Sequence, residues 1–161
     1  MKEILVDKEG YNQFFEKLEN LKNESTSNAN TLSKSFNDYV GDGWHDNPVY
    51  EEAMRKSRMI DDDIQKMLDQ QKYLKVVEDD YNESLVNIND IVEIEYIYSK
   101  DDKETEIIKL TGKYIPNTDL QIKEITLNSP VGKTIYKKKL NETYSYNVGN
   151  NTVNIRIIRK L

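Results

Sequence analysis

The sequence predicts an α+β protein in which an antiparallel helical hairpin precedes a small antiparallel β-sheet with one short helix. Two observations carry this prediction. Apolar residues recur with a heptad spacing in the first half of the chain and alternate with polar residues in the second half. Signals for helix starts, each an N-cap residue followed by proline, occur at Asn47-Pro48 and at Ser129-Pro130. We therefore expect a coiled-coil hairpin domain over residues 1–81 and a sheet domain over residues 82–161, with residues 82–87 as the boundary.

The first helix is predicted from a seam of residues in steps of four and three. The seam consists of Phe14, Leu18, Leu21, Ser25, Asn28, Leu32, Ser35 and Tyr39. Because its middle is polar, the stretch 25–35 is where the helical prediction is weakest.

The second helix is predicted to begin after Asn47, with Pro48 in the first helical position. The seam consists of Tyr50, Ala53, Ser57, Ile60, Ile64, Met67, Gln71 and Leu74. A short connection makes the two helices antiparallel neighbours, each about 50 Å long at 1.5 Å per residue. Together they predict a continuous hairpin over residues 8–79.

The period changes to two after Tyr81, with β-branched and aromatic residues at the apolar positions. Strands are predicted in residues 88–98, 105–111 and 122–127, and a short helix over residues 131–138. Two further strands, 144–148 and 153–157, flank the turn signal Gly149-Asn150-Asn151.

Composition excludes several classes of site. The chain has 161 residues, no cysteine and one histidine, so a disulfide, a thiol nucleophile and a multi-histidine metal centre are excluded. No apolar run is long enough to span a membrane, and we expect a soluble cytoplasmic protein. The net charge of −6 disfavours duplex nucleic acid as a ligand, although seven basic residues and one acid occur from Pro130 onward. That basic end could meet an acidic partner or be a solvated surface.

The connection between the helices, residues 41–47, contains the only tryptophan and the only histidine of the chain, Trp44 and His45, between Asp42 and Asp46. Gly41 or Gly43 and the cap Asn47 are enough to make the turn. Trp44 is not needed for it, and either packs under the turn or contacts a partner.

This connection and a second segment resemble the bacterial Gre transcript-cleavage factors, GreA and GreB. The Gre tip reads Gly-Asp-Leu-Ser-Glu-Asn-Ala-Glu-Tyr, and this chain has Gly41-Asp42, Asp46-Asn47, Tyr50 and Ala53. The more specific match is Ile125-Thr-Leu-Asn-Ser-Pro-Val-Gly-Lys-Thr-Ile-Tyr-Lys-Lys-Lys139, which is similar to the family segment that begins Ser-Val-Asn-Ser-Pro and ends Gly-Lys. The resemblance covers nearly the whole chain and implies that the second domain is FKBP-like.

The resemblance implies an accessory factor, not an enzyme, whose partners are RNA polymerase and the 3′ end of backtracked RNA. Such a factor inserts its tip into the secondary channel, and the polymerase's own active site cuts the RNA. Asp42 and Asp46 would be the catalytic acids, sharing Mg²⁺ with the polymerase in the complex only, with no tightly bound cofactor. The family has two residues between Gly-Asp and Glu-Asn, whereas this chain has Gly43-Trp44-His45. If this connection is aligned with the family's tip without a gap, Gly43 occupies the position of the first acid. The resemblance therefore assigns the catalytic role more firmly to Asp46 than to Asp42.

The resemblance also implies further contacts, each with a purely structural alternative. Trp44, His45 and Asn47 would be contacts of the tip, and Arg55, Lys56 and Arg58 would touch RNA or form a solvated helix face. The polymerase-docking residues would be Ser129, Pro130, Lys137, Lys138 and Lys139. Helix capping and a solvated helix end explain the same residues structurally.

Three other functions stay open. A Gre-like factor could occupy the channel and inhibit the polymerase, and this tip differs from the family's. An FKBP-like peptidyl-prolyl isomerase is more remote, because the aromatic residues are mostly tyrosines on alternating strand positions. A bare coiled-coil scaffold would leave the tip and the segment 125–139 unexplained. For the Gre-like factor that the resemblance implies, we expect a monomer with neither a membrane nor a small-molecule substrate as partner.

Overall fold

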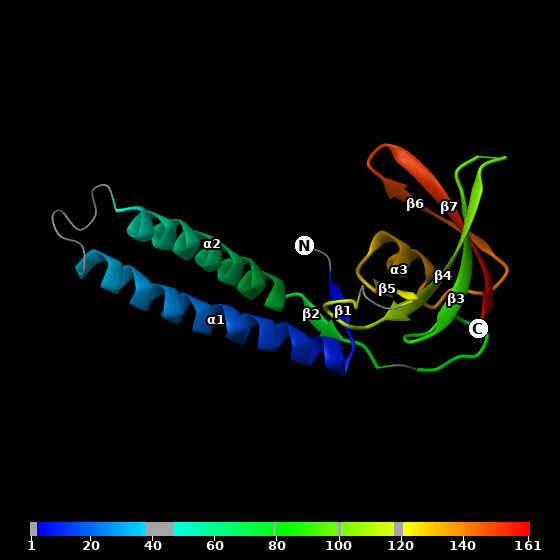
Figure 1. The fold of residues 1–161 in the computed structure, drawn as a ribbon. Coiled ribbons are helices and arrows are strands. Elements are labelled where there is room, and N and C mark those ends of the chain that lie inside the picture. The colour runs from blue at the N-terminus through cyan, green and yellow to red at the C-terminus, as the bar shows by residue number, and fades with distance from the viewer. Residues whose placement is uncertain (1–2, 38–46, 79, 100, 118–120) are drawn as a thin grey trace. The chain divides into compact units, whose positions relative to one another are not determined.

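The computed structural model describes residues 3–37, 47–78, 80–99, 101–117 and 121–161. The chain divides into two compact units (Figure 1). The helical unit comprises Phe14–Tyr73, and the sheet unit comprises Lys2–Gln13 together with Leu74–Leu161. The predicted α+β class is confirmed: apart from a short strand at residues 4–6, two long helices precede the strands and the one short helix. The division differs from the boundary at residue 82 that the sequence suggested, because the N-terminal residues and the chain from Leu74 onward belong with the sheet.

Two helices form the helical unit, α1 (Lys8–Asn37, beginning in the sheet unit) and α2 (Pro48–Gln71). Figure 1 shows them antiparallel and side by side. The predicted seam is confirmed for the described residues, since each of its positions within α1 and α2 up to Met67 is buried or half-buried. The helices contain 30 and 24 residues, or about 45 and 36 Å at 1.5 Å per residue.

The polar middle of the seam makes a contact between the helices and does not interrupt α1. Asn28 is 7% exposed, and its Nδ2 donates a 2.8 Å hydrogen bond to the main-chain oxygen of Ala53. Outside the seam, Lys56 pairs with Glu24 at 2.9 Å. Residues 25–35 are helical, as the spacing predicted.

The prediction that the second helix continues to about residue 79 is wrong. After α2 ends at Gln71, β2 (Leu74–Val76) pairs in parallel with β1 (Ile4–Val6), a sheet that the sequence did not predict. Beyond this pairing, the Val77 amide donates to the Val6 oxygen at 2.8 Å. The extended backbone is therefore fixed by a partner strand far away in the sequence.

The main sheet contains β3 (Ile91–Ile97), β4 (Lys103–Thr111), β5 (Lys123–Thr126), β6 (Thr143–Val148) and β7 (Asn151–Lys160). Their order is β5-β4-β3-β7-β6. All neighbours are antiparallel except β4 and β5, which are parallel. The prediction of a wholly antiparallel sheet is wrong at this edge, where the long connection 112–122 brings the chain back in the same direction.

One face of this sheet carries the core of the unit. Val92, Ile94 and Tyr96 alternate with half-buried residues along β3, which explains the period of two in the sequence. The short helix α3 (Pro130–Ile135) contributes Ile135 to the same core. The other members are Val86, Ile88, Ile108, Leu110, Leu127, Ile155 and Ile157.

Helix α3 is shorter than the predicted range 131–138. It ends at Ile135 because Tyr136 has a ψ of 128° and Lys137 has a φ of 55°, neither of which continues a helix. None of the helices in the described residues is long and apolar enough to cross a membrane.

The N-terminal segment is held in the sheet unit by hydrogen bonds at several points. The side chain of Asn128 pairs with both main-chain groups of Leu5, at 2.9 and 2.8 Å. The Asp7 amide donates to the oxygen of Gly112 at 2.9 Å. At Gly10, a Cβ would lie 2.3 Å from that same oxygen, so only glycine fits this approach.

Candidate functional site

The connection between α1 and α2 carries the acids and aromatic residues that the sequence singled out. Asp42, Trp44, His45 and Asp46 lie outside the described residues, so their roles stay predictions. The structure describes the base of this connection, where α1 ends at Asn37 and α2 begins at Pro48.

Asn47 forms that base and is 2% exposed. Its Oδ1 accepts from the Tyr50 amide at 3.1 Å, which confirms the predicted N-cap. Its Nδ2 donates to the oxygen of Ser35 at 2.8 Å and so ties the start of α2 to the end of α1. The side chain is thus buried and positions the two helices, and the expected role of Asn47 as a tip contact stays a prediction.

Apolar side chains surround this base. The rings of Phe36 and Tyr50 lie 5.9 Å apart, one from each helix. Phe36 is 46% exposed and Val49 is 59% exposed. A hollow of about 420 Å³ lies beside them, lined by Val49, Ala53 and Asn28 among others. This end of the helical unit thus presents apolar surface next to a charged connection.

The predicted RNA contacts lie on the exposed side of α2, and two of them have acidic partners. Arg55 pairs with Glu52 at 2.6 Å, and this hydrogen bond and charge raise the pKa of the guanidinium above its ordinary value. Lys56 pairs with Glu24. Arg58 lines a second hollow, of about 540 Å³, together with residues that include Met54, Met59, Glu51 and Asp62. This face carries both signs of charge.

In the sheet unit, Ser129 and Pro130 start α3 as the sequence predicted. Ser129 Oγ accepts from the Gly132 amide at 2.9 Å and donates to the oxygen of Thr126 at 2.9 Å. A Cβ on Gly132 would lie 2.0 Å from that same oxygen. These contacts give the Ser-Pro-Val-Gly sequence a structural explanation that is independent of docking.

The three lysines after α3 have different surroundings. Lys137 donates from Nζ to the oxygen of Asp80 and to Asn87 Oδ1, the latter at 3.1 Å. Lys138 and Lys139 are exposed, and Lys138 Nζ lies 5.4 Å from the centre of the Tyr144 ring. Of the predicted docking lysines, these two have side chains at the surface, whereas Lys137 is part of a structural network.

That network is a feature that sequence reasoning missed. Asn87 is fully buried, and its Nδ2 donates to the main-chain oxygens of Asn82 and Leu85 at 2.8 and 2.9 Å. The Asn87 amide donates to Asp90 Oδ2 at 2.7 Å, and the same carboxylate pairs with Lys160 at 2.8 Å. No periodicity or motif distinguishes these polar residues from surface residues, so the sequence held no signal for them.

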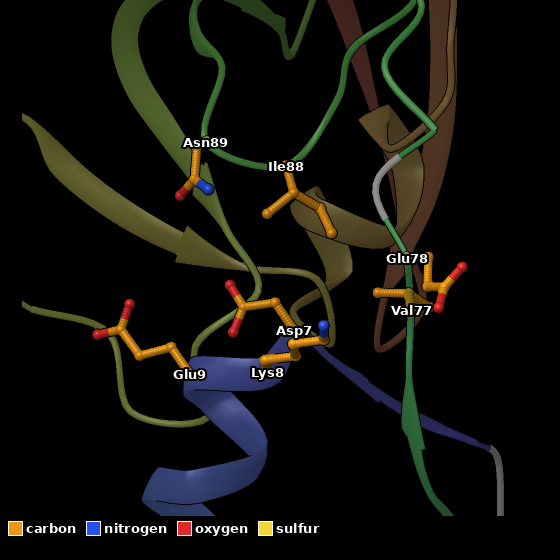
Figure 2. Close-up of a pocket in the computed structure, with 7 residues that line it drawn as sticks. All are labelled: Asp7, Lys8, Glu9, Val77, Glu78, Ile88 and Asn89. Carbon is orange, nitrogen blue, oxygen red and sulfur yellow. The ribbon is translucent and has the colours of Figure 1, made fainter.

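A hollow of about 490 Å³ lies within the sheet unit, between the first turn of α1 and the segments 77–78 and 88–89 (Figure 2). Its lining combines apolar Val77 and Ile88 with the charged side chains of Lys8, Glu9 and Glu78. Asp7 is already used as a cap, because its Oδ1 accepts from the Gly10 amide at 2.6 Å. Within the described residues no group of three or more metal-ligating side chains could hold an ion, here or elsewhere.

Glu124 is the most buried acid of the described chain, at 3% exposed. Burial alone raises the pKa of this carboxyl. Hydrogen bonds from the Asn117 amide and Lys109, with the charges of Lys113 and Lys109, outweigh burial and lower the pKa below its ordinary value. The carboxylate thus holds a loop and two lysines in place, and is a structural group.

No family model and no curated protein matches the chain. Comparison with solved structures does find similar chains. Transcription factor Gfh1 has a TM-score of 0.46 and 17% identity, and Gfh1 of Thermus aquaticus has a TM-score of 0.46 and 16% identity, each over 99% of both chains. The transcription elongation factor GreA/GreB of Nitrosomonas europaea has a TM-score of 0.36 and 14% identity over 68% of this chain and 91% of its own. Gre factors and a GreA homologue are thus among the solved structures to which this chain is similar.

Proposed function

We propose that the chain is a Gre-like transcription factor that binds RNA polymerase and stimulates the polymerase's cleavage of backtracked RNA. One observation carries the proposal. The antiparallel hairpin presents the segment Gly41-Asp42…Asp46-Asn47 at the end of two helices about 36–45 Å long, and Asn47 ties both helices together where that segment ends. Two long antiparallel helices with acids in the connection between them suit insertion into the secondary channel of a polymerase.

The match at residues 125–139 supports the proposal through the second unit. In this segment β5 runs directly into the capped helix α3, and the exposed Lys138 and Lys139 come after it. These two lysines would dock on the polymerase, with Ser129 and Pro130 holding the helix that precedes them.

The chemistry requires hard oxygen ligands, and Asp42 and Asp46 supply carboxylates. These two residues would hold Mg²⁺ jointly with the polymerase, and the ion would polarise a water and neutralise developing charge on the phosphodiester. The chain itself would contribute position and negative charge and act as an accessory factor. Asp46 is one methylene shorter than the family's glutamate, so its reach depends on how firmly Asn47 anchors the connection.

The test uses a backtracked elongation complex with RNA labelled at its 5′ end, to which the purified protein is added. The wild type should shorten the RNA in a Mg²⁺-dependent manner. Asp46→Asn should bind equally well but lower the cleavage rate by about 10²-fold, the size of effect seen for one preorganised transition-state contact. Asp61→Asn, the same change at an exposed acid of α2, is the matched control and should leave the rate unchanged.

The Asp42→Asn variant distinguishes the two alignments of the tip. A loss equal to that at Asp46 means that both acids act, despite the extra residue in Gly43-Trp44-His45. Full activity means that Asp42 takes no part and that Gly43 stands in place of the first acid. Absence of cleavage by the wild type at every Mg²⁺ concentration would contradict the proposal.

The inhibitory alternative is favoured by that same extra residue, because it adds Trp44 to the connection. A factor of this kind would slow RNA synthesis without shortening RNA, and Trp44→Ala should relieve the inhibition. Measuring elongation and cleavage in the same complexes separates the two functions.

A further inference from the structure

Strand β6 forms one edge of the main sheet and pairs with β7 alone among the described strands. Its six residues, Thr-Tyr-Ser-Tyr-Asn-Val, include no charge and no proline. The opposite edge, β5, has four residues and carries Lys123 and Glu124. Since charged residues, proline and short length are the usual protection of an edge against pairing, β6 is the unprotected edge of this sheet.

The register with β7 shows which peptide groups of β6 are available. Val148 faces Asn151 across the two-residue turn, and this closing pair exchanges its hydrogen bonds within the hairpin. Because the pattern alternates in an antiparallel ladder, Tyr146 and Tyr144 also bond to β7. The N–H and C=O groups of Ser145 and Asn147 therefore point away from the sheet.

The side chains of Ser145 and Asn147 bond to β7, and within the part of the chain that the structure describes no hydrogen bond is made to the outward peptide groups of these two residues. Ser145 Oγ donates to Asn154 Oδ1 at 2.7 Å, and Thr152 Oγ1 donates to Asn147 Oδ1 at 2.9 Å. These cross-strand bonds make the hairpin a fixed template.

The surroundings indicate the chemistry of a partner strand. Val148 is 53% exposed and Tyr146 is half-buried on one face of β6, which offers apolar contact at alternate positions. Lys138 and Lys139 precede the strand, and Arg156 of β7 lies in register with Thr143. Glu142 is the single acid after Pro130, and its carboxylate accepts from the Tyr144 hydroxyl. The edge is therefore flanked by positive charge.

We propose that the outer edge of β6 is a docking site for an extended, acidic segment of a partner protein, which adds to the sheet as a sixth strand. Main-chain hydrogen bonds to Ser145 and Asn147 would provide the pairing. Apolar side chains of the segment would lie beside Tyr146 and Val148 on one face, and its acidic side chains would lie on the other face, which carries Arg156. This inference does not rest on the proposed function, because any partner with such a segment would serve.

The probe is an acetylated and amidated peptide of alternating valine and glutamate, long enough to pair with the whole of β6. Binding to the full chain is followed by NMR of the backbone amides and by anisotropy of a labelled peptide. We expect the amides of Ser145 and Asn147 to shift and to become protected from exchange. Affinity should fall as salt rises, because the flanking charges are exposed.

Ser145→Pro removes the outward N–H without breaking the ladder to β7, since an edge strand tolerates proline where the N–H faces solvent. It should weaken peptide binding by about tenfold or more, which corresponds to the loss of one main-chain hydrogen bond and the weakening of the hydrogen bonds next to it. Ser145→Ala is the matched control. It removes the Oγ bond to Asn154 but keeps the peptide N–H, and should bind within about twofold of the wild type.

Three outcomes would overturn the proposal. Equal binding by Ser145→Pro and Ser145→Ala would show that the β6 edge is not where the peptide lies. Stronger binding of an alternating valine and lysine peptide would contradict the acidic partner. A concentration-dependent dimer in sedimentation that Ser145→Pro abolishes would make a second copy of this chain the occupant. Circular dichroism of both variants verifies that the sheet is intact.

Discussion

Replacing Gly10 by alanine should destabilise this protein, although the same change in a helix interior ordinarily stabilises by about 0.5–1 kcal/mol. Gly10 lies at the beginning of α1, where the helix passes the end of β4. An alanine Cβ would lie 2.3 Å from the Gly112 oxygen and 2.8 Å from the Tyr114 nitrogen. Both neighbours are main-chain atoms, so the chain after β4 must move by about 1 Å to restore ordinary contact.

The cost arises from the hydrogen bonds that such a movement disturbs. The Gly112 oxygen accepts from the Asp7 amide at 2.9 Å, and Gln13 Oε1 accepts from the Tyr114 amide at 3.1 Å. Weakening these two hydrogen bonds costs about 0.5–1.5 kcal/mol each, and crowding costs about 1–3 kcal/mol more. Together these costs exceed the gain in helix propensity from replacing glycine by alanine. We expect a net loss of about 2 kcal/mol in the free energy of unfolding. For a chain of this length, that lowers Tm by about 4–8 °C.

Thermal and urea unfolding followed by circular dichroism measure the loss, and amide exchange at Asp7 and Tyr114 locates it. Asn12→Ala is the control, because Asn12 is exposed two residues further along α1 and its replacement should stabilise by a few tenths of a kcal/mol. If Gly10→Ala raises Tm as Asn12→Ala does, the close approach between the start of α1 and the chain after β4 is wrong.

Three further predictions concern other parts of the chain. Asn28→Leu should raise the midpoint of thermal unfolding but give more than one set of amide signals in NMR. The reason is that the variant loses the hydrogen bond to Ala53 that fixes the register of the two helices. A single set of signals would contradict this prediction. Glu124→Gln should flatten the dependence of stability on pH. Because the pKa of Glu124 is lowered in the folded protein, the carboxylate stabilises the fold at pH values above its ordinary pKa of 4.5. This contribution is lost as the pH falls through the folded pKa, so the stabilities of wild type and variant should converge in acid. Lys138→Glu with Lys139→Glu should weaken polymerase binding at low salt, and the difference should shrink as salt screens the charges; equal affinity at low salt would exclude this face.

The hairpin could be predicted because a helix repeats one geometric relation many times. Each step of three or four residues from Phe14 onward returns to the same side of α1, and the structure buries or half-buries those positions. Strands β1 and β2 have three residues each, too few to show a period. Their pairing joins Ile4 to Leu74, and nothing in either segment indicates a partner so far along the chain. The parallel direction of β5 could not be predicted for a similar reason, because side chains alternate in the same way in parallel and antiparallel strands.

At the candidate site, residue type predicted local chemistry but not which side chains are free. Asn47 was predicted correctly as a cap, because capping depends on the next few residues. The second bond of Asn47, to Ser35, depends on how α1 and α2 meet, and it removes the side chain from the surface. Lys137 gives the same lesson in the sheet unit. Its charge placed it in a run with its two neighbours, but its ammonium is bound to Asn87 and to a main-chain oxygen. Reversing the charge of Lys137 would therefore remove two hydrogen bonds that hold the segment 80–87, one of them to the buried side chain of Asn87, so a docking experiment that includes it cannot separate lost binding from lost local structure.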